Sequence, residues 1–192
     1  IYPDTVAWLK QLSGFDDVAN QWPELELDKI LGEMSRLNGI MNIEAGVDGD
    51  ELRAIFISRL AERGITITEQ QFTSITDPLA RIYAIPDHLH ALCNMLGDGL
   101  VPSNAKAGYL ARMLARRTLR MRDELGINVS LAELAMHHVE VNLGGRIMKQ
   151  THDGIATILK LEEAKYSEML RKGEQVINCL LYTSDAADDC RC

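Results

Sequence analysis

Apolar residues recur every three to four positions along most of this chain, and that period predicts α-helices rather than strands. The clearest case is GDELRAIFISRLAERG at 49–64, where Asp50 is a good N-cap and Gly64 a good stop. Strand-like alternation and internal repeats are not evident. Further helices are expected at 4–12, 28–38, from Asp77 to Pro86, from Pro86 to about Gly97, and at 108–125, 131–143 and 153–177. We therefore expect an all-α fold, an irregular bundle of six to eight helices with a disordered C-terminal tail.

Local signals set the expected helix boundaries. Pro78 suits the first turn of a helix opened by Asp77, and Pro86 should interrupt that helix and begin a new one. Ser130 and Glu133 have the spacing of a capping box. Asp153 is expected to cap the last helix, and residues 13–26 should form a loop.

The sequence changes character from Asn178 onward, where NCLLYTSDAADDCRC loses the helical period. This segment also resembles translated sequencing adapter. We expect two parts: residues 1–177 as a folded region, and residues 178–192 as a non-native or disordered tail. Cys190 and Cys192 lack a second pair of ligands, so we predict no metal site there.

Composition places the chain among ordinary globular proteins, with 46% hydrophobic and 25% charged residues in 192. Apolar runs stay short of the roughly 20 residues of a membrane span. The first ten residues, IYPDTVAWLK, lack a signal-peptide pattern, and the absence of an initial Met indicates a missing start. Cys93 is expected to be a buried thiol in a reduced, cytoplasmic protein.

Charge is unevenly distributed in this acidic chain of formal net charge −8, because 106–122 holds six basic residues and no acidic one. At about 100° per residue, Arg112, Arg116 and Arg120 form one stripe. The apolar face is expected to consist of Leu110, Met113, Leu114 and Met121. The stripe is therefore expected to be exposed. It is either a solvated face paired with acidic neighbours or a phosphate track extended by Lys106.

Arg117 falls in the middle of that expected apolar face. A buried guanidinium needs a partner, and Asp87 or Asp98 is the nearest candidate. His88 is expected to be structural rather than catalytic. In the loop before the helix, Ser103 or Asn104 could cap the helix, or the Asn104 amide could read a base edge.

The string IYAIPDHLHALCNMLGDGLVPSNAKAGYLARMLARRTLR, residues 82–120, resembles the central signature of alanyl-tRNA synthetases. EEAKYSEMLRKGEQVI at 162–177 resembles a later segment of that family, and the lead-in resembles its archaeal-type branch. The resemblance covers about 1–177. Two positions depart from the pattern: Pro86 replaces the usual Ala, and His90 replaces the usual Arg beside Asp87.

The resemblance implies that this chain is the helical tRNA-recognition region that follows a class II catalytic domain. The class II signature motifs are absent from the sequence, so ATP, Mg²⁺ and alanine would bind elsewhere in the full-length alanine–tRNA ligase. An editing region beyond the end of this chain could hold Zn²⁺. The implied partners are the acceptor stem of tRNA(Ala) and the upstream catalytic domain, with no DNA and no membrane.

By the same resemblance, the Asn104 oxygen would accept a hydrogen bond from the exocyclic amine of guanine in a wobble G·U pair. A second, acidic reader is expected just past residue 177. No catalytic or metal-binding residue is assigned. The candidate tRNA-binding residues are Asn104, Ser103, Lys106, Arg112, Arg116 and Arg120. The candidate structural residues are Asp87, His88, Asp98 and Arg117.

Two other function classes stay open. One is an all-helical, metal-dependent His-Asp phosphohydrolase, since Asp87-His88, His137-His138 and His152-Asp153 supply suitable residue types. Their spacing matches no known ligand pattern. The other is a helical interaction domain with a solvated basic face, for which replacing Asn104 would change nothing.

Overall fold

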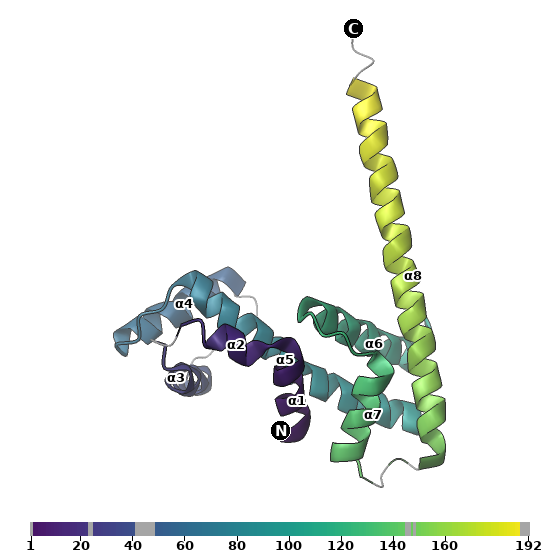
Figure 1. The fold of residues 1–192 in the computed structure, drawn as a ribbon, viewed down its shortest axis with the longest axis horizontal. Helices are drawn as coiled ribbons and strands as arrows, with labels where there is room; N and C mark the ends of the chain where they lie inside the picture. The colour runs from purple at the N-terminus through teal and green to yellow at the C-terminus, as the bar shows by residue number, and fades with distance from the viewer. Residues whose placement is uncertain (1, 23–24, 41–48, 145–146, 148, 189–192) are drawn as a thin grey trace. The chain divides into compact units, whose positions relative to one another are not determined.

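The computed structural model describes residues 2–22, 25–40, 49–144, 147 and 149–188. This part of the chain contains eight α-helices and no strand, which confirms the all-α expectation (Figure 1). The helices are α1 (Pro3–Ser13), α2 (Phe15–Ala19), α3 (Leu27–Ile40), α4 (Gly49–Glu62), α5 (Glu69–Gly97), α6 (Lys106–Glu124), α7 (Leu131–Asn142) and α8 (Lys149–Asp188). Within the described ranges, no helix combines the length and the apolar content that crossing a bilayer requires.

The chain divides into two compact units, one made of residues 6–83 and the other of residues 1–5 and 84–192. The expected folded region 1–177 thus contains two units. In the first unit α3 packs on α4, and the Phe56 and Phe72 rings stack with centroids 6.3 Å apart. Gly64 ends α4 as expected, at a φ of +79°, which lets the Ile65 N–H donate to the Leu60 carbonyl over 3.0 Å. Helix α2 was missed because it is only five residues long; it places Phe15 in the core.

Helix α5 corrects the expected break at Pro86. It is one continuous helix that begins eight residues before Asp77 and contains both Pro78 and Pro86. Its true start is a capping box: the Gln71 N–H donates to Thr68 Oγ1 over 3.2 Å, and the Thr68 N–H donates to Gln71 Oε1 over 3.0 Å. Proline removes one helical hydrogen bond, and the helix tolerates that loss because its apolar stripe is buried on both sides of Pro86. That stripe includes Ile82, Ile85, Leu89 and Leu92.

The second unit packs α6, α7 and α8 against one another, and α7 contacts the C-terminal part of α5. The expected apolar face of α6 was wrong: Leu110 is exposed, and Met113, Leu114 and Met121 are only half-buried. The buried positions of α6 are Gly108, Ala111, Ala115, Thr118 and Leu119. Small side chains occupy the closest approach because they let neighbouring helix backbones come near.

Cys93 is fully buried, as expected, and its Sγ lies 3.9 Å from the Ala135 carbonyl of α7. Burial raises the pKa of this thiol to about 12, so it remains protonated and acts as a small apolar side chain.

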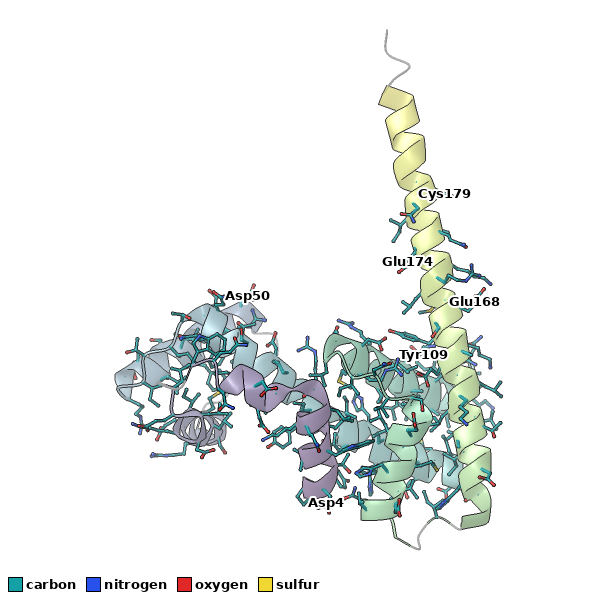
Figure 2. All side chains as sticks on the ribbon, viewed as in Figure 1. Asp4, Asp50, Tyr109, Glu168, Glu174 and Cys179 are labelled. Atoms are coloured by element: carbon teal, nitrogen blue, oxygen red, sulfur yellow. The ribbon has the colours of Figure 1, made fainter. Side chains whose placement is uncertain are left out.

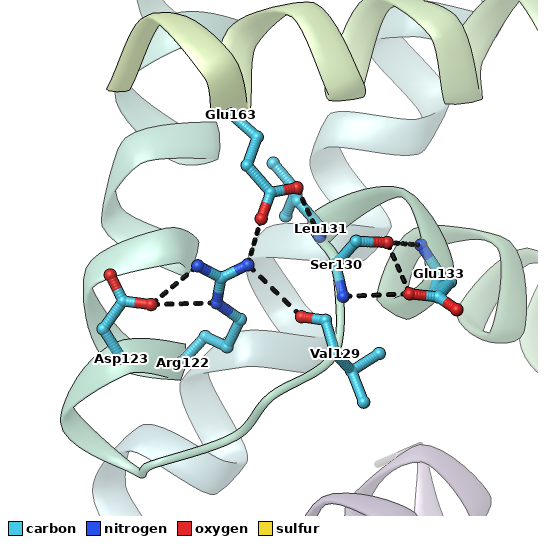
Figure 3. A network of polar contacts seen from close by, with 7 residues as sticks. All are labelled: Arg122, Asp123, Val129, Ser130, Leu131, Glu133 and Glu163. Carbon is cyan, nitrogen blue, oxygen red and sulfur yellow. Dashed lines mark hydrogen bonds and ion pairs between the residues drawn. The ribbon is translucent and has the colours of Figure 1, made fainter. Parts of the chain in front are cut away.

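The end of α6, the start of α7 and helix α8 meet at a polar junction (Figure 3). Arg122 donates to Glu163, and also to the Val129 carbonyl over 3.2 Å. Glu163 in turn accepts from the Leu131 N–H over 3.0 Å. Burial alone would lower the pKa of Arg122, but its hydrogen bonds to Glu163 and Asp123 outweigh burial and raise it. One carboxylate therefore holds three helices in register.

The start of α7 and the two ends of α8 can be compared with the expected helix boundaries. The Ser130–Glu133 capping box is present, so the start of α7 is confirmed. Asp153 is not a cap, because α8 already begins at Lys149. Helix α8 also extends to Asp188, past the expected end near Ile177, while the origin of 178–192 stays a prediction.

Candidate nucleic-acid interface

The loop before α6 folds back onto the first turns of that helix. The Ser103 N–H donates to the Gly108 carbonyl over 3.0 Å. A Cβ at residue 108 would lie 2.1 Å from Ser103 Oγ and 2.7 Å from the Val101 carbonyl oxygen. Only glycine allows this approach, so Gly108 holds Ser103 and Asn104 close to the helix.

The helix itself is not capped as expected. Ala105 occupies the N-cap position of α6 without a side-chain cap, and Ser103 Oγ instead donates to the Ala105 carbonyl over 3.0 Å. Lys106, the first helical residue, has a φ of +50°, a conformation that costs energy for a residue with a Cβ. The side chains of Asn104 and Lys106 are both exposed there.

Asn104 is held by Arg112. Arg112 Nη1 donates to Asn104 Oδ1, and Arg112 Nη2 donates to the Pro102 carbonyl over 3.4 Å. A guanidinium has donors only, so the amide oxygen of Asn104 must face Arg112 and its NH₂ group must face elsewhere. The oxygen keeps one further lone pair that can accept another hydrogen bond.

Glu162 of α8 corrects the expectation that the whole stripe is exposed, and it is an acidic neighbour of the kind that one of the two alternatives expected. Its carboxylate side chain is 2% exposed and lies 2.9 Å from Arg112 Nε and 3.6 Å from Arg116 Nε. These contacts are ion pairs rather than well-directed hydrogen bonds. Lys165 Nζ lies 3.8 Å from the other carboxylate oxygen. Two of the three stripe arginines are therefore partly buried and share one negative charge.

The remaining arginines of this face point to solvent. Arg120 is 74% exposed and pairs with Glu124 over 2.8 Å, a hydrogen bond that raises its pKa. Arg117 is exposed, so the expectation that it is buried was wrong. No ion pair to Asp87 or Asp98 is found among the described residues. Arg117 is exposed because α6 packs through its small residues rather than through Met113 and Leu114.

A pocket of about 350 Å³ lies between α6 and α8. Tyr109, Met113, Tyr166 and Met169 form the apolar part of its lining, and Arg116 Nη1 lies 3.4 Å from Met169 Sδ. Tyr109 is exposed on the α6 side, as Figure 2 shows, and Tyr166 is buried. Burial raises the pKa of the Tyr166 hydroxyl, which therefore stays neutral and can donate. Four arginines and Asn104 complete the lining.

Three of the four expected structural residues, Asp87, His88 and Asp98, lie on α5 and the turn after it, and Arg117 lies on α6. His88 is half-buried; burial lowers its pKa, Arg117 lowers it further and Asp87 opposes them. Asp87 and Asp98 are exposed. Burial and, to a smaller extent, Arg117 therefore favour the neutral form of the His88 imidazole, and the structural role of His88 stays a prediction.

His90, where the sequence pattern departs from the family, joins a separate cluster. Its Nδ1 lies 3.3 Å from His138 Nε2, and the Tyr2 ring stacks on it at 5.0 Å. The His90 side chain therefore has partners, His138 and Tyr2, within its own unit. Among the described residues, no group of three His, Cys, Asp or Glu side chains could hold a metal ion.

Sequence reasoning missed Glu162, Tyr109 and Tyr166. Glu162 and Tyr166 fall within the segment 162–177 already noted for its resemblance, but helical period alone cannot show that this segment lies beside α6. The contact between α6 and α8 decides which arginines of α6 pair with Glu162 and which remain exposed to solvent.

The family model of class II tRNA synthetases (A) matches residues 26–189 of this chain. Curated proteins named alanine–tRNA ligase are similar to it. The protein from Methanococcoides burtonii is 36% identical over 177 residues, which is 92% of this chain and 18% of that protein. The protein from Pyrococcus furiosus is 39% identical over 170 residues, or 88% of this chain and 17% of that protein. The chain thus spans less than a fifth of the length of these relatives.

Proposed function

Because the chain belongs to the alanyl class of class II tRNA synthetases, of archaeal type, we propose that the full-length protein joins alanine to tRNA. In this proposal the present chain binds and positions the tRNA acceptor stem. ATP and Mg²⁺ would act at a catalytic domain upstream, and Zn²⁺ in an editing region downstream. Binding and positioning can contribute several kcal/mol to a reaction performed elsewhere.

The observation that carries the proposal is the placement of Asn104 beside the arginines of α6. The Asn104 amide is exposed at the loop and fixed by Arg112, and Arg116, Arg117 and Arg120 line the same pocket. Three of these four arginines pair with two carboxylates, Glu162 and Glu124. The surface therefore keeps a positive excess, which suits a polyanion.

The chemistry of this surface fits a helical RNA stem. A-form RNA presents a wide, shallow minor groove with base edges and 2′-hydroxyls. Arginines can hold the phosphates and set the register, while one amide reads a base edge. The free lone pair of Asn104 Oδ1 can accept from the exocyclic amine of guanine in a G·U pair, and its NH₂ can donate to a neighbouring acceptor.

The test is binding of the 192-residue chain to two acceptor-stem hairpins, one with a G·U pair and one with G·C at the same position. Arg120→Ala should weaken binding to both hairpins and reduce the salt slope by about 1, because it removes one phosphate contact. Asn104→Ala should reduce only the difference in binding free energy between the G·U and G·C hairpins, by about 1 kcal/mol. Arg171→Ala on α8, which removes an exposed arginine paired with Glu168, is the matched control and should change neither.

Two binding results would contradict the proposal. If the unsubstituted chain binds neither hairpin at low salt, the basic face is a solvated surface, as in a helical interaction domain. If Arg171→Ala weakens binding as much as Arg120→Ala, the attraction comes from overall charge and not from this face.

A further inference from the structure

We propose that Glu162 is a positioning residue that gives the α6 face its selectivity by restraining two of its arginines. The proposal rests on the RNA-binding function proposed above and adds a residue on α8 to it. Glu162 would touch no RNA. It would act through Arg112, which in turn holds the loop that carries Asn104.

The geometry forms a chain of contacts from α8 to the loop. The buried Glu162 carboxylate lies 2.9 Å from Arg112 Nε. The far end of the same guanidinium donates to Asn104 Oδ1 and to the Pro102 carbonyl. One guanidinium thus engages three groups at once, through two hydrogen bonds and one ion pair. Fixing Arg112 therefore fixes which side of the Asn104 amide faces outward.

The charge of Glu162 has a second consequence. It lies between Arg112 and Arg116, so it partly neutralises both cations. A cation paired with a buried carboxylate is less available for phosphate, and phosphate contacts carry no sequence information. Glu162 should thus lower non-selective affinity while it raises selectivity, and removing its charge should change these two properties in opposite directions.

Glu162→Gln tests this, because it removes the charge and keeps the shape. We expect the preference for the G·U hairpin to fall by about fivefold, toward that of Asn104→Ala. We also expect tighter binding to the G·C hairpin and a salt slope steeper by about 1. Glu168→Gln removes one charge from an exposed part of α8, where Glu168 pairs with Arg171 and Lys172. It should leave the G·U preference unchanged.

A merely structural role would give a different pattern. If Glu162→Gln weakens both hairpins in parallel with a loss of thermal stability, Glu162 is only a packing residue and the proposal is wrong. Arg112→Lys is the second variant, since it keeps the charge but cannot reach all three partners. It should lose the G·U preference with no change in salt slope; an unchanged preference would overturn the proposal.

Amide hydrogen exchange of residues 98–108 separates this proposal from the RNA-binding function. Glu162→Gln should speed exchange in that loop relative to Glu168→Gln, with no RNA present. If the loop loosens but no hairpin binds, the restraint stands and the RNA function fails. If hairpins bind selectively but Glu162→Gln changes neither loop exchange nor preference, the restraint fails and the RNA function stands.

Discussion

His138 shows how much one buried side chain can depend on its neighbours. It is fully buried, and its Nδ1 lies 3.3 Å from Asn142 Nδ2, which can only donate. The Thr5 hydroxyl, which can donate or accept, also lies 3.3 Å from Nδ1, and Nε2 lies 3.3 Å from His90 Nδ1. Burial, followed by smaller effects of His90 and His137, lowers the pKa of His138 to about 4. The imidazole is thus neutral in the folded protein.

The lowered pKa of His138 predicts that the protein loses stability in mild acid. In the unfolded chain His138 titrates near its ordinary pKa of 6.5, so between pH 6.5 and 4 the unfolded state binds more protons. The free energy of unfolding should therefore be highest above pH 6.5. It should fall by up to about 3 kcal/mol as the pH drops toward 4. Urea unfolding at several pH values from 7.5 to 4.5, followed by circular dichroism, measures this.

His138→Gln is the control for that pH dependence. It removes the titrating group, so the slope between pH 6.5 and 5 should become flatter whatever the absolute stability of the variant. A slope equal to that of the unsubstituted protein would show that another group causes the loss.

At the scale of one element, α5 illustrates a local rule overridden by packing. Pro86 is buried in the middle of a helix of 29 residues. Its missing N–H leaves the Ile82 carbonyl without its helical donor. The helix persists because Ile82, Ile85 and Leu89 lose all contact with water, which stabilises the helix more than one hydrogen bond would.

Pro86→Ala should accordingly stabilise the protein. Alanine restores the hydrogen bond and has the highest helix propensity, while proline restricts the unfolded chain, which offsets part of the gain. We expect an increase of about 1–2 kcal/mol in the free energy of unfolding, measured by guanidinium denaturation. Pro78→Ala in the same helix should act in the same direction. A decrease for Pro86→Ala would show that packing of the proline ring matters more than the hydrogen bond.

At the scale of the whole molecule, the part of the protein that carries the candidate interface ends well before the end of α8. Glu162 and Tyr166 are buried, whereas every residue from Ser167 to Leu180 is exposed. In the second unit, the C-terminal half of α8 extends beyond α6 and α7 (Figure 1). That half of the helix contributes little buried surface.

Ending the chain after Ile177 should therefore leave stability and hairpin binding unchanged. The free energy of unfolding should stay within about 0.5 kcal/mol, as for surface changes. Ending it after Leu161 is the contrasting variant, since it removes Glu162, Glu163 and Tyr166, and it should abolish both folding of the second unit and hairpin binding. Thermal unfolding and hairpin titration of the two shortened chains provide the comparison. Destabilisation by the Ile177 truncation would mean that the distal part of α8 packs on the rest of the unit.

The sequence by itself determined the class of fold, most helix boundaries and the family. Some signals depend only on residues a few positions apart, so the local sequence is enough to predict them. They are the helical period, the Gly64 stop and the Ser130–Glu133 capping box. The segment 82–120 carries the family resemblance because its residue types and spacing are specific, and the family match agrees with it.

Only the tertiary structure decided which polar groups are free. The helical period placed Arg112 and Arg116 on an exposed stripe and Arg117 in the apolar face, yet Arg112 and Arg116 share the buried Glu162 while Arg117 is exposed. The continuous course of α5 through Pro86 also depends on burial and not on local propensity. Both outcomes come from contacts between residues far apart in the chain, whose energy exceeds any local preference and leaves no periodic signal in the sequence.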